Sequence, residues 1–78
     1  MTPAQCRAAR GLLDWTQVKL AEAAGVGLTT VTSFERSWRC NYPDTIQAMK
    51  RALEAAGIEF ISENGSGAGV RMKKGKLN

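Results

Sequence analysis

Few residues in this chain are of the types that carry out chemistry. The sequence has no histidine, which removes the commonest general base, the commonest metal ligand and every Cys–His or Ser–His arrangement. The two cysteines, Cys6 and Cys40, lie far apart without CxxC spacing, so a structural zinc site is excluded. Gly65, Gly67 and Gly69 are spaced like a nucleotide-binding loop, but no helix follows them, which favours a turn. We therefore expect no enzyme, no metal, no cofactor and no small-molecule ligand.

The chemistry that remains is hydrogen bonding and charge. The chain has 11 lysines and arginines against 7 acidic residues, for a net charge of +4. The excess lies at the end of the chain, in Arg71, Lys73, Lys74 and Lys76, so residues 1–70 carry no net charge. Overall charge alone therefore does not predict nucleic-acid binding, and a binding face must come from where individual side chains lie.

Four segments have the apolar periodicity of amphipathic helices. Thr2 and Gln5 are spaced for a capping box at the start of the first helix. Thr16 is placed to cap the second helix, and Gly25 is placed to end it, because glycine adopts the left-handed conformation without a Cβ clash. The helices are expected over residues 3–13, 17–24, 28–36 and 43–56.

The pattern changes after Gly57. Residues 58–61 are rich in strand formers, and residues 70–73 alternate apolar and basic side chains beyond a glycine-rich turn, which predicts a hairpin. Residues 74–78 form a basic end that we expect to be disordered. The fold class is therefore expected to be mainly α, with four to five helices and a short C-terminal β-hairpin or strand.

Residues 17–36 fit two short helices joined by a tight turn. Gly25 allows the turn, and Ala21 is small where the following helix crosses close to it. Helix 28–36 presents a polar face on the side away from this contact. The segment therefore predicts a helix-turn-helix. The apolar residues expected between its helices are Leu20, Ala24, Val26, Val31 and Phe34.

The sequence resembles the Cro-like, or Xre, family of bacterial and phage repressors. The resemblance covers residues 1–57, which include the helix-turn-helix segment. Trp15-Thr16-Gln17 is similar to the L-S-Q opening of the second helix in that family. The run 24–35 is similar to its A-G-V-S-x-x-T-I-S-x-x-E pattern, and Pro43-x-Thr45-Ile46 is similar to the P-x-T-L start of its fourth helix. The resemblance implies a repressor-like helix-turn-helix domain that binds double-stranded DNA.

The resemblance also implies roles for individual residues. Arg10 and Glu35 match a pair that bridges helices in the family, so we expect a structural ion pair. Gly27 replaces the family's capping serine, and Ser37 replaces the glycine that often ends its recognition helix. The residues expected to contact DNA bases from the major groove are Leu28, Thr29, Thr32 and Ser33. The residues expected to contact phosphates are Gln17, Arg36 and Arg39.

The C-terminal segment suggests a second copy of the chain as a partner. We expect residues 1–57 to form the DNA-binding domain and residues 58–73 to dimerise it, because a lone hairpin is marginal in water and its strand edges invite pairing. A chain cut after Gly57 would then be a folded monomer. Residues 74–78 would be solvated or would contact phosphate. The expected dimer-interface residues are Ile58, Phe60, Ile61, Val70 and Met72.

The function expected from the sequence is a transcriptional regulator, in the first place a repressor, that binds a palindromic operator as a homodimer. The alternative is an antitoxin-like module that binds a partner protein through its C-terminal segment. The N-terminus has no apolar signal core, and no stretch is long and apolar enough to span a membrane. We therefore expect a cytoplasmic protein with free thiols and no membrane contact.

Overall fold

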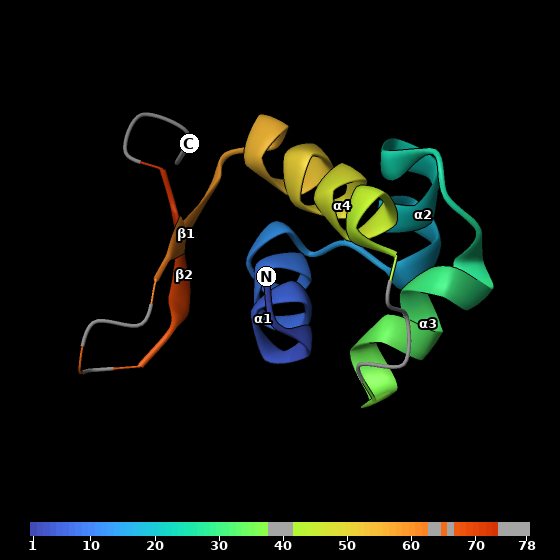
Figure 1. Ribbon diagram of the computed structural model, residues 1–78. Helices are drawn as coiled ribbons and strands as arrows, with labels where there is room; N and C mark the ends of the chain where they lie inside the picture. The colour runs from blue at the N-terminus through green and yellow to red at the C-terminus, as the bar shows by residue number, and fades with distance from the viewer. Residues whose placement is uncertain (38–41, 63–64, 66, 74–78) are drawn as a thin grey trace.

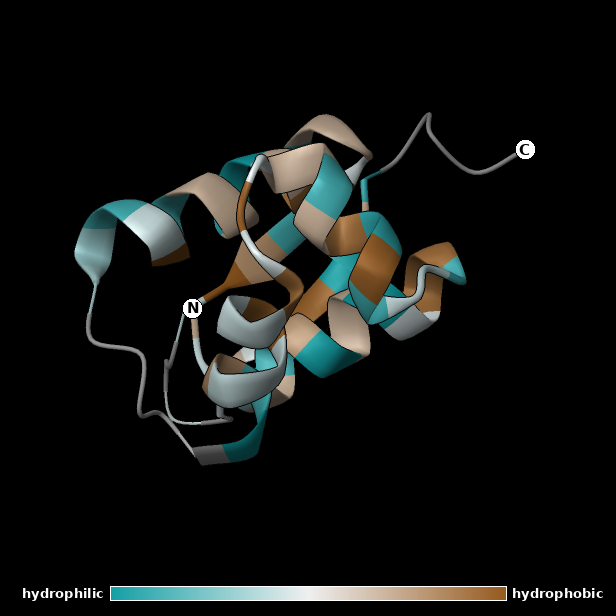
Figure 2. Cartoon of the chain, turned by 90° about the vertical axis from the view of Figure 1, so that its right-hand side faces the viewer, coloured by the Kyte–Doolittle hydropathy of each residue, from teal (hydrophilic) through white to brown (hydrophobic). Residues whose placement is uncertain are grey.

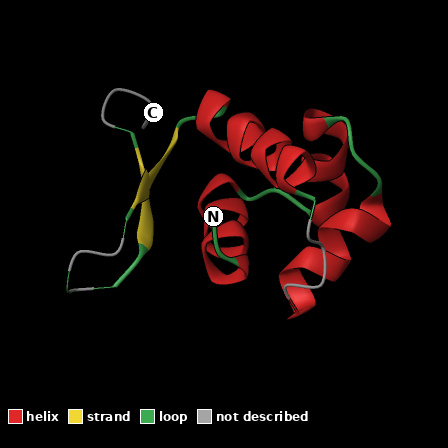
Figure 3. Cartoon of the chain, in the orientation of Figure 1, coloured by secondary structure: helices red, strands yellow, loops and turns green. Residues whose placement is uncertain are grey.

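The computed structural model describes residues 1–37, 42–62, 65 and 67–73. Within these residues the chain forms four helices followed by one antiparallel hairpin (Figures 1 and 3). The expected mainly α fold with a short C-terminal hairpin is therefore confirmed. The elements are α1 (Pro3–Leu13), α2 (Gln17–Ala24), α3 (Leu28–Ser37), α4 (Pro43–Ala55), β1 (Ile58–Ile61) and β2 (Gly69–Met72).

The helix ends are stabilised by the local signals present in the sequence. Thr2 and Gln5 form both hydrogen bonds of a capping box at the start of α1. The Thr16 hydroxyl accepts from the backbone N–H of Lys19 at 3.0 Å, which caps α2. Gly25 ends α2 with φ 70°, and Asp14 ends α1 with φ 58°. Asp14 is the one described non-glycine residue in the left-handed region, and the sequence had not singled it out.

A single hydrophobic core joins the four helices to the hairpin. Side chains from every helix and from β1 are fully or almost fully buried, and the apolar segments gather where the elements meet (Figure 2). On α1, α3 and α4 the core residues lie three or four positions apart, as helical periodicity requires, and α2 contributes two adjacent residues. The core residues are Cys6, Ala9, Leu20, Ala21, Val31, Phe34, Met49, Leu53 and Ile58.

The hairpin lies against the helices with its apolar face inward. Its register pairs Ile58 with Met72 and Phe60 with Val70, so these four side chains share one face. Ile58 is only 2% exposed, and the other three pack against the core. Ile58 belongs to the same core as the helices, so this core extends across the boundary expected at Gly57.

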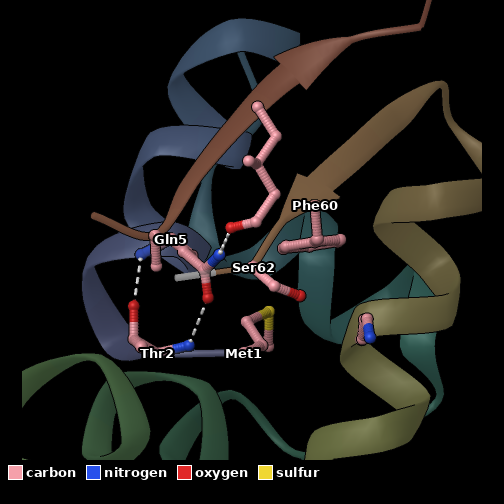
Figure 4. Close-up of a pocket in the computed structure, with 8 residues that line it drawn as sticks. Met1, Thr2, Gln5, Phe60 and Ser62 are labelled. Atoms are coloured by element: carbon pink, nitrogen blue, oxygen red, sulfur yellow. Dashed lines mark hydrogen bonds between the residues drawn. The ribbon is translucent and has the colours of Figure 1, made fainter. Parts of the chain in front are cut away.

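The Gln5 side chain fastens the far end of the hairpin to the start of α1. Its Nε2 donates to the backbone carbonyls of Gly69 at 2.9 Å and Ile61 at 3.3 Å. Its Oε1 accepts from the Thr2 backbone N–H at 2.8 Å, so both ends of the buried amide are satisfied (Figure 4). A residue predicted only as a helix cap therefore also holds the hairpin against α1.

None of the helices in the described part of the chain is long and apolar enough to cross a membrane. Arg39, Cys40 and the basic tail at 74–78 lie outside the described residues. The phosphate contact, the free thiol and the disordered end expected for them stay predictions.

Candidate nucleic-acid interface

Helices α2 and α3 pack against each other through buried apolar side chains. Leu20, Val31 and Phe34 have no solvent exposure, and Ala21 is almost fully buried. The Val26 backbone N–H donates to the Ala21 carbonyl at 3.0 Å, which tightens the turn at Gly25. Ala24 and Val26 are partly buried against the same cluster. The seven positions expected to build the helix-turn-helix therefore lie where the motif requires them.

The outward face of α3 carries the four residues expected to contact bases. Leu28 and Thr29 are exposed at its first turn, and Thr32 and Ser33 are half-buried one turn later. Arg36 continues the same stripe as an exposed side chain, because positions 28, 29, 32, 33 and 36 follow the helical repeat. The Thr32 hydroxyl donates to the Thr29 carbonyl at 3.0 Å. Leu28, Thr29 and Arg36 are therefore at the surface, and small side chains line most of the stripe.

The carboxylate of Glu35 joins three helices from the inner side of α3. Arg10 on α1 binds it with two hydrogen bonds of 2.7 Å, one from Nε and one from Nη2. The third Arg10 nitrogen, Nη1, donates to the Trp15 carbonyl at 3.0 Å in the connection between α1 and α2. The expected structural ion pair is therefore confirmed, with the planar, two-point geometry that arginine favours.

Two further donors complete the site around Glu35, and sequence reasoning missed both roles. The Gln17 amide on α2 donates to Oε1 at 3.0 Å, and the Cys6 thiol on α1 donates to Oε2 at 3.1 Å. Cys6 is fully buried as a free thiol, and it also acts as a hydrogen-bond donor. Nothing in the local sequence of Cys6 or Gln17 indicates an acceptor 29 or 18 positions away.

These contacts set the charge states at the site. Burial raises the pKa of Glu35, but the hydrogen bonds from Arg10, Cys6 and Gln17 outweigh it, and the pKa lies below its ordinary value. The hydrogen bond to Glu35 raises the pKa of Arg10. Burial, followed by the hydrogen bond to Glu35, raises the pKa of the Cys6 thiol far above its usual range. Glu35 is therefore ionised, and its charge is neutralised inside the protein.

The C-terminal half of α3 is also held by Arg7, whose Nη1 donates to the Glu35 backbone carbonyl. Carbonyls in the last turn of a helix have no partner within the helix, and a cation there also opposes the negative end of the helix dipole. Arg7 and Arg10 thus tie the C-terminal half of α3 to α1, which is a structural role.

The residues expected to contact phosphates have different surroundings. Arg36 is exposed at the far end of the stripe on α3. Gln17 lies at the start of α2, but its amide nitrogen donates to Glu35, so this side chain also has a structural role. Arg39 lies outside the described residues. Of the three, Arg36 is the side chain whose described surroundings leave its charge at the surface.

A pocket of about 270 Å³ lies on a different part of the surface, between the start of α1, α4 and the end of β1 (Figure 4). Lys50 is placed 5.7 Å from the centre of the Phe60 ring at this pocket. The buried Gln5 amide at its edge is already satisfied by backbone groups. Among the described residues, no group of three or more His, Cys, Asp or Glu is arranged to hold a metal ion.

Comparison of the chain with models of known protein families finds no match, and comparison with curated proteins finds no matching relative. The fold and the site define a small, mainly helical domain with a helix-turn-helix, an outward stripe on α3 and a buried ion-pair network behind it.

Proposed function

We propose that this chain is a sequence-specific, double-stranded DNA-binding regulator, in the first place a repressor, with α3 in the major groove. The observation that carries the proposal is the separation of the two faces of α3. Its only acidic residue, Glu35, is buried and paired with Arg10, whereas its outward stripe ends in the exposed Arg36. A groove lined by phosphates therefore meets no carboxylate from α3.

The side chains on the stripe favour a particular balance between affinity and specificity. Threonine and serine hydroxyls discriminate between bases less strongly than the two-point contact of arginine with guanine or of glutamine with adenine. Phosphate contacts and DNA shape must then supply much of the affinity. The proposal therefore includes a marked dependence of binding on salt, with base contacts that sharpen the choice of site.

The first prediction separates base contacts from phosphate contacts. For the best site selected from a random duplex pool, Thr29→Ala is expected to weaken the free energy of DNA binding by about 1–3 kcal/mol. The variant is also expected to have a weaker sequence preference. Arg36→Ala weakens all duplexes alike and lowers the slope of log Kd against log salt by roughly 0.9, because one phosphate contact is lost. Titrations over a series of salt concentrations measure both effects.

The matched control for this prediction is Leu12→Ala on α1, which changes an exposed side chain outside the stripe and leaves both quantities unchanged. Equal affinity of the wild-type protein for every duplex contradicts sequence-specific binding. An unchanged preference in Thr29→Ala with tight binding retained contradicts the role of α3.

The proposal includes a homodimer formed by the strand edges of the hairpin. The Lys73 N–H donates to the Gly57 carbonyl, so the backbone groups of alternate residues on each strand point away from the partner strand. Among the described residues these outer edges have no further strand. The hairpin lies on the opposite side of α1 from α3 (Figure 1), so pairing there leaves both α3 helices uncovered. The outward-pointing backbone groups belong to Ile58, Phe60, Val70 and Met72.

The roles of the five expected interface residues change accordingly. Ile58 is already buried, and Phe60, Val70 and Met72 pack against their own core, so their side chains are taken up within one chain. Ile61 is paired with Gly69 and shares the outer face with the exposed ion pair between Glu59 and Arg71. The proposed contact is therefore made by backbone edges, with Ile61 as the apolar side chain beside them.

The second prediction tests this dimer in the full chain. Ile61→Lys places a charge beside the edge, and charged edge residues oppose strand pairing. Sedimentation is expected to show a dimer for the wild type and a monomer for Ile61→Lys, with operator binding weakened by loss of the second half-site. Leu12→Lys introduces the same charge elsewhere and stays dimeric. A dimeric Ile61→Lys variant, or a monomeric wild type, rules out the edge-paired dimer.

The alternative, an antitoxin-like module, has no specific observation in its favour. Its binding segment would be the hairpin, whose apolar face is already covered by α1 and α4 of the same chain. A partner that co-purifies with the wild type and is lost in Ile61→Lys would move the assignment to this alternative.

A further inference from the structure

The first turn of α3 offers apolar chemistry to a DNA groove. Leu28, its first residue, is 45% exposed, and Thr29 beside it is also exposed. A leucine at the tip of a helix that faces water would gain from a partner with an apolar surface. In the major groove the one apolar group on a base edge is the C5-methyl group of thymine.

The hydroxyl of Thr32 adds little donor capacity to the same face. Its proton is used in the hydrogen bond to the Thr29 carbonyl at 3.0 Å, as threonine commonly does within a helix. What Thr32 has left for a partner is its methyl group and the lone pairs of its hydroxyl oxygen. A guanine edge in the major groove, which presents acceptors only, finds no donor in this hydroxyl.

The stronger base-reading groups are also unavailable near Leu28. Positions 28–33 contain no arginine, lysine, asparagine or glutamine, and these are the residues that bind guanine or adenine at two points. The Gln17 amide at the start of α2 is engaged with Glu35. Around the first turn of α3, the hydroxyl of Thr29 can contact donors or acceptors on a base edge, and Leu28 adds an apolar contact that only the methyl group of thymine can make.

We propose that Leu28 is a specificity-determining residue that reads the C5-methyl group of a thymine, so that each half-site has a T·A pair beneath the first turn of α3. This inference rests on the proposed function, because it requires α3 to lie in the major groove. It goes further by naming the base and the atom group that are recognised.

The test replaces thymine by deoxyuridine, which removes the methyl group and leaves base pairing intact. Each thymine of the site selected from a random duplex pool is replaced in turn, and Kd is measured for the wild type and for Leu28→Ala. The wild type is expected to lose about fourfold in affinity at one thymine of each half-site. This figure is the ~0.8 kcal/mol for a buried methylene-sized group converted at ~1.4 kcal/mol per tenfold.

Two comparisons make the result specific. Leu28→Ala is expected to bind the thymine and uracil duplexes equally at that position. Leu12→Ala, which truncates a leucine of similar exposure (48%) on α1, is expected to keep the fourfold difference. Thermal melting checks that all three proteins are folded.

The outcomes separate this inference from the proposed function. If selection yields no preferred sequence, the proposed function fails and the inference falls with it. If a preferred sequence is found but uracil has no effect at any position, or the same effect in Leu28→Ala, the reading of thymine by Leu28 is wrong while sequence-specific binding stands.

Discussion

Replacing Arg10 with methionine is expected to lower the free energy of unfolding by about 3–5 kcal/mol, because it leaves the buried Glu35 carboxylate without its cation. The Glu35 side chain is 2% exposed, so water cannot replace the two lost hydrogen bonds. For a domain of this size, about 4–8 °C are lost per kcal/mol, so the melting temperature falls by roughly 12 °C at least. Thermal and urea unfolding measure the change. DNA affinity per folded molecule is expected to stay the same, because Arg10 contacts Glu35 and Trp15 inside the protein.

Arg10→Lys is the matched control, because it keeps the charge but loses the two-point geometry. Its stability is expected to lie between those of the wild type and Arg10→Met.

Acid titration gives a second measurement of the role of Arg10. In the wild type, folding lowers the pKa of Glu35 from its ordinary value of 4.5. Its contribution to the stability of the fold is therefore complete above about pH 4.5 and is lost as the pH falls through the lower pKa of the folded state. Arg10→Met loses the cation that contributes to this lowered pKa, so the pH-dependent part of the stabilisation is expected to be smaller than in the wild type. An unchanged melting temperature with lost DNA binding would instead make Arg10 a DNA contact.

A chain that ends at Gly57 is expected to lose its cooperative fold. The cut removes Ile58 from the core, and deleting one such side chain alone costs about 2–5 kcal/mol. It also removes Phe60, Val70 and Met72, which cover α1 and α4, from a protein whose total stability is on the order of 5–15 kcal/mol. This expected result replaces the folded monomer that the sequence suggested.

Circular dichroism during heating measures the effect of the cut. A chain that ends at Lys73 retains every described residue and is expected to melt as the full chain does. Ile58→Ala in the full chain is expected to remain folded, with its stability reduced by the core contribution alone. A sharp melt and native helical signal for residues 1–57 would show instead that the helices form an independent domain.

The helices and strands and several of their ends could be predicted from the sequence, because they depend on interactions between neighbouring residues. The capping box at Thr2 and Gln5, the cap at Thr16 and the stop at Gly25 all involve groups within a few positions of one another. Helical periodicity likewise determined the inward and outward faces of α3. The pairing of Arg10 with Glu35 was expected from the family resemblance, since the spacing of the two residues alone does not require it.

Contacts between residues far apart in the sequence became visible in the folded structure alone. Alternate residues along β1 share a face, but the sequence does not show whether the helices cover that face. In the fold α1 and α4 pack against the hairpin, and Ile58 therefore lies in the core. The Gln5 amide reaches a carbonyl 64 positions away, and the Cys6 thiol reaches Glu35 across two helices. A buried polar group loses its hydrogen bonds to water, so it forms hydrogen bonds with the protein groups that lie beside it in the fold. Which groups these are depends on how the helices and strands pack.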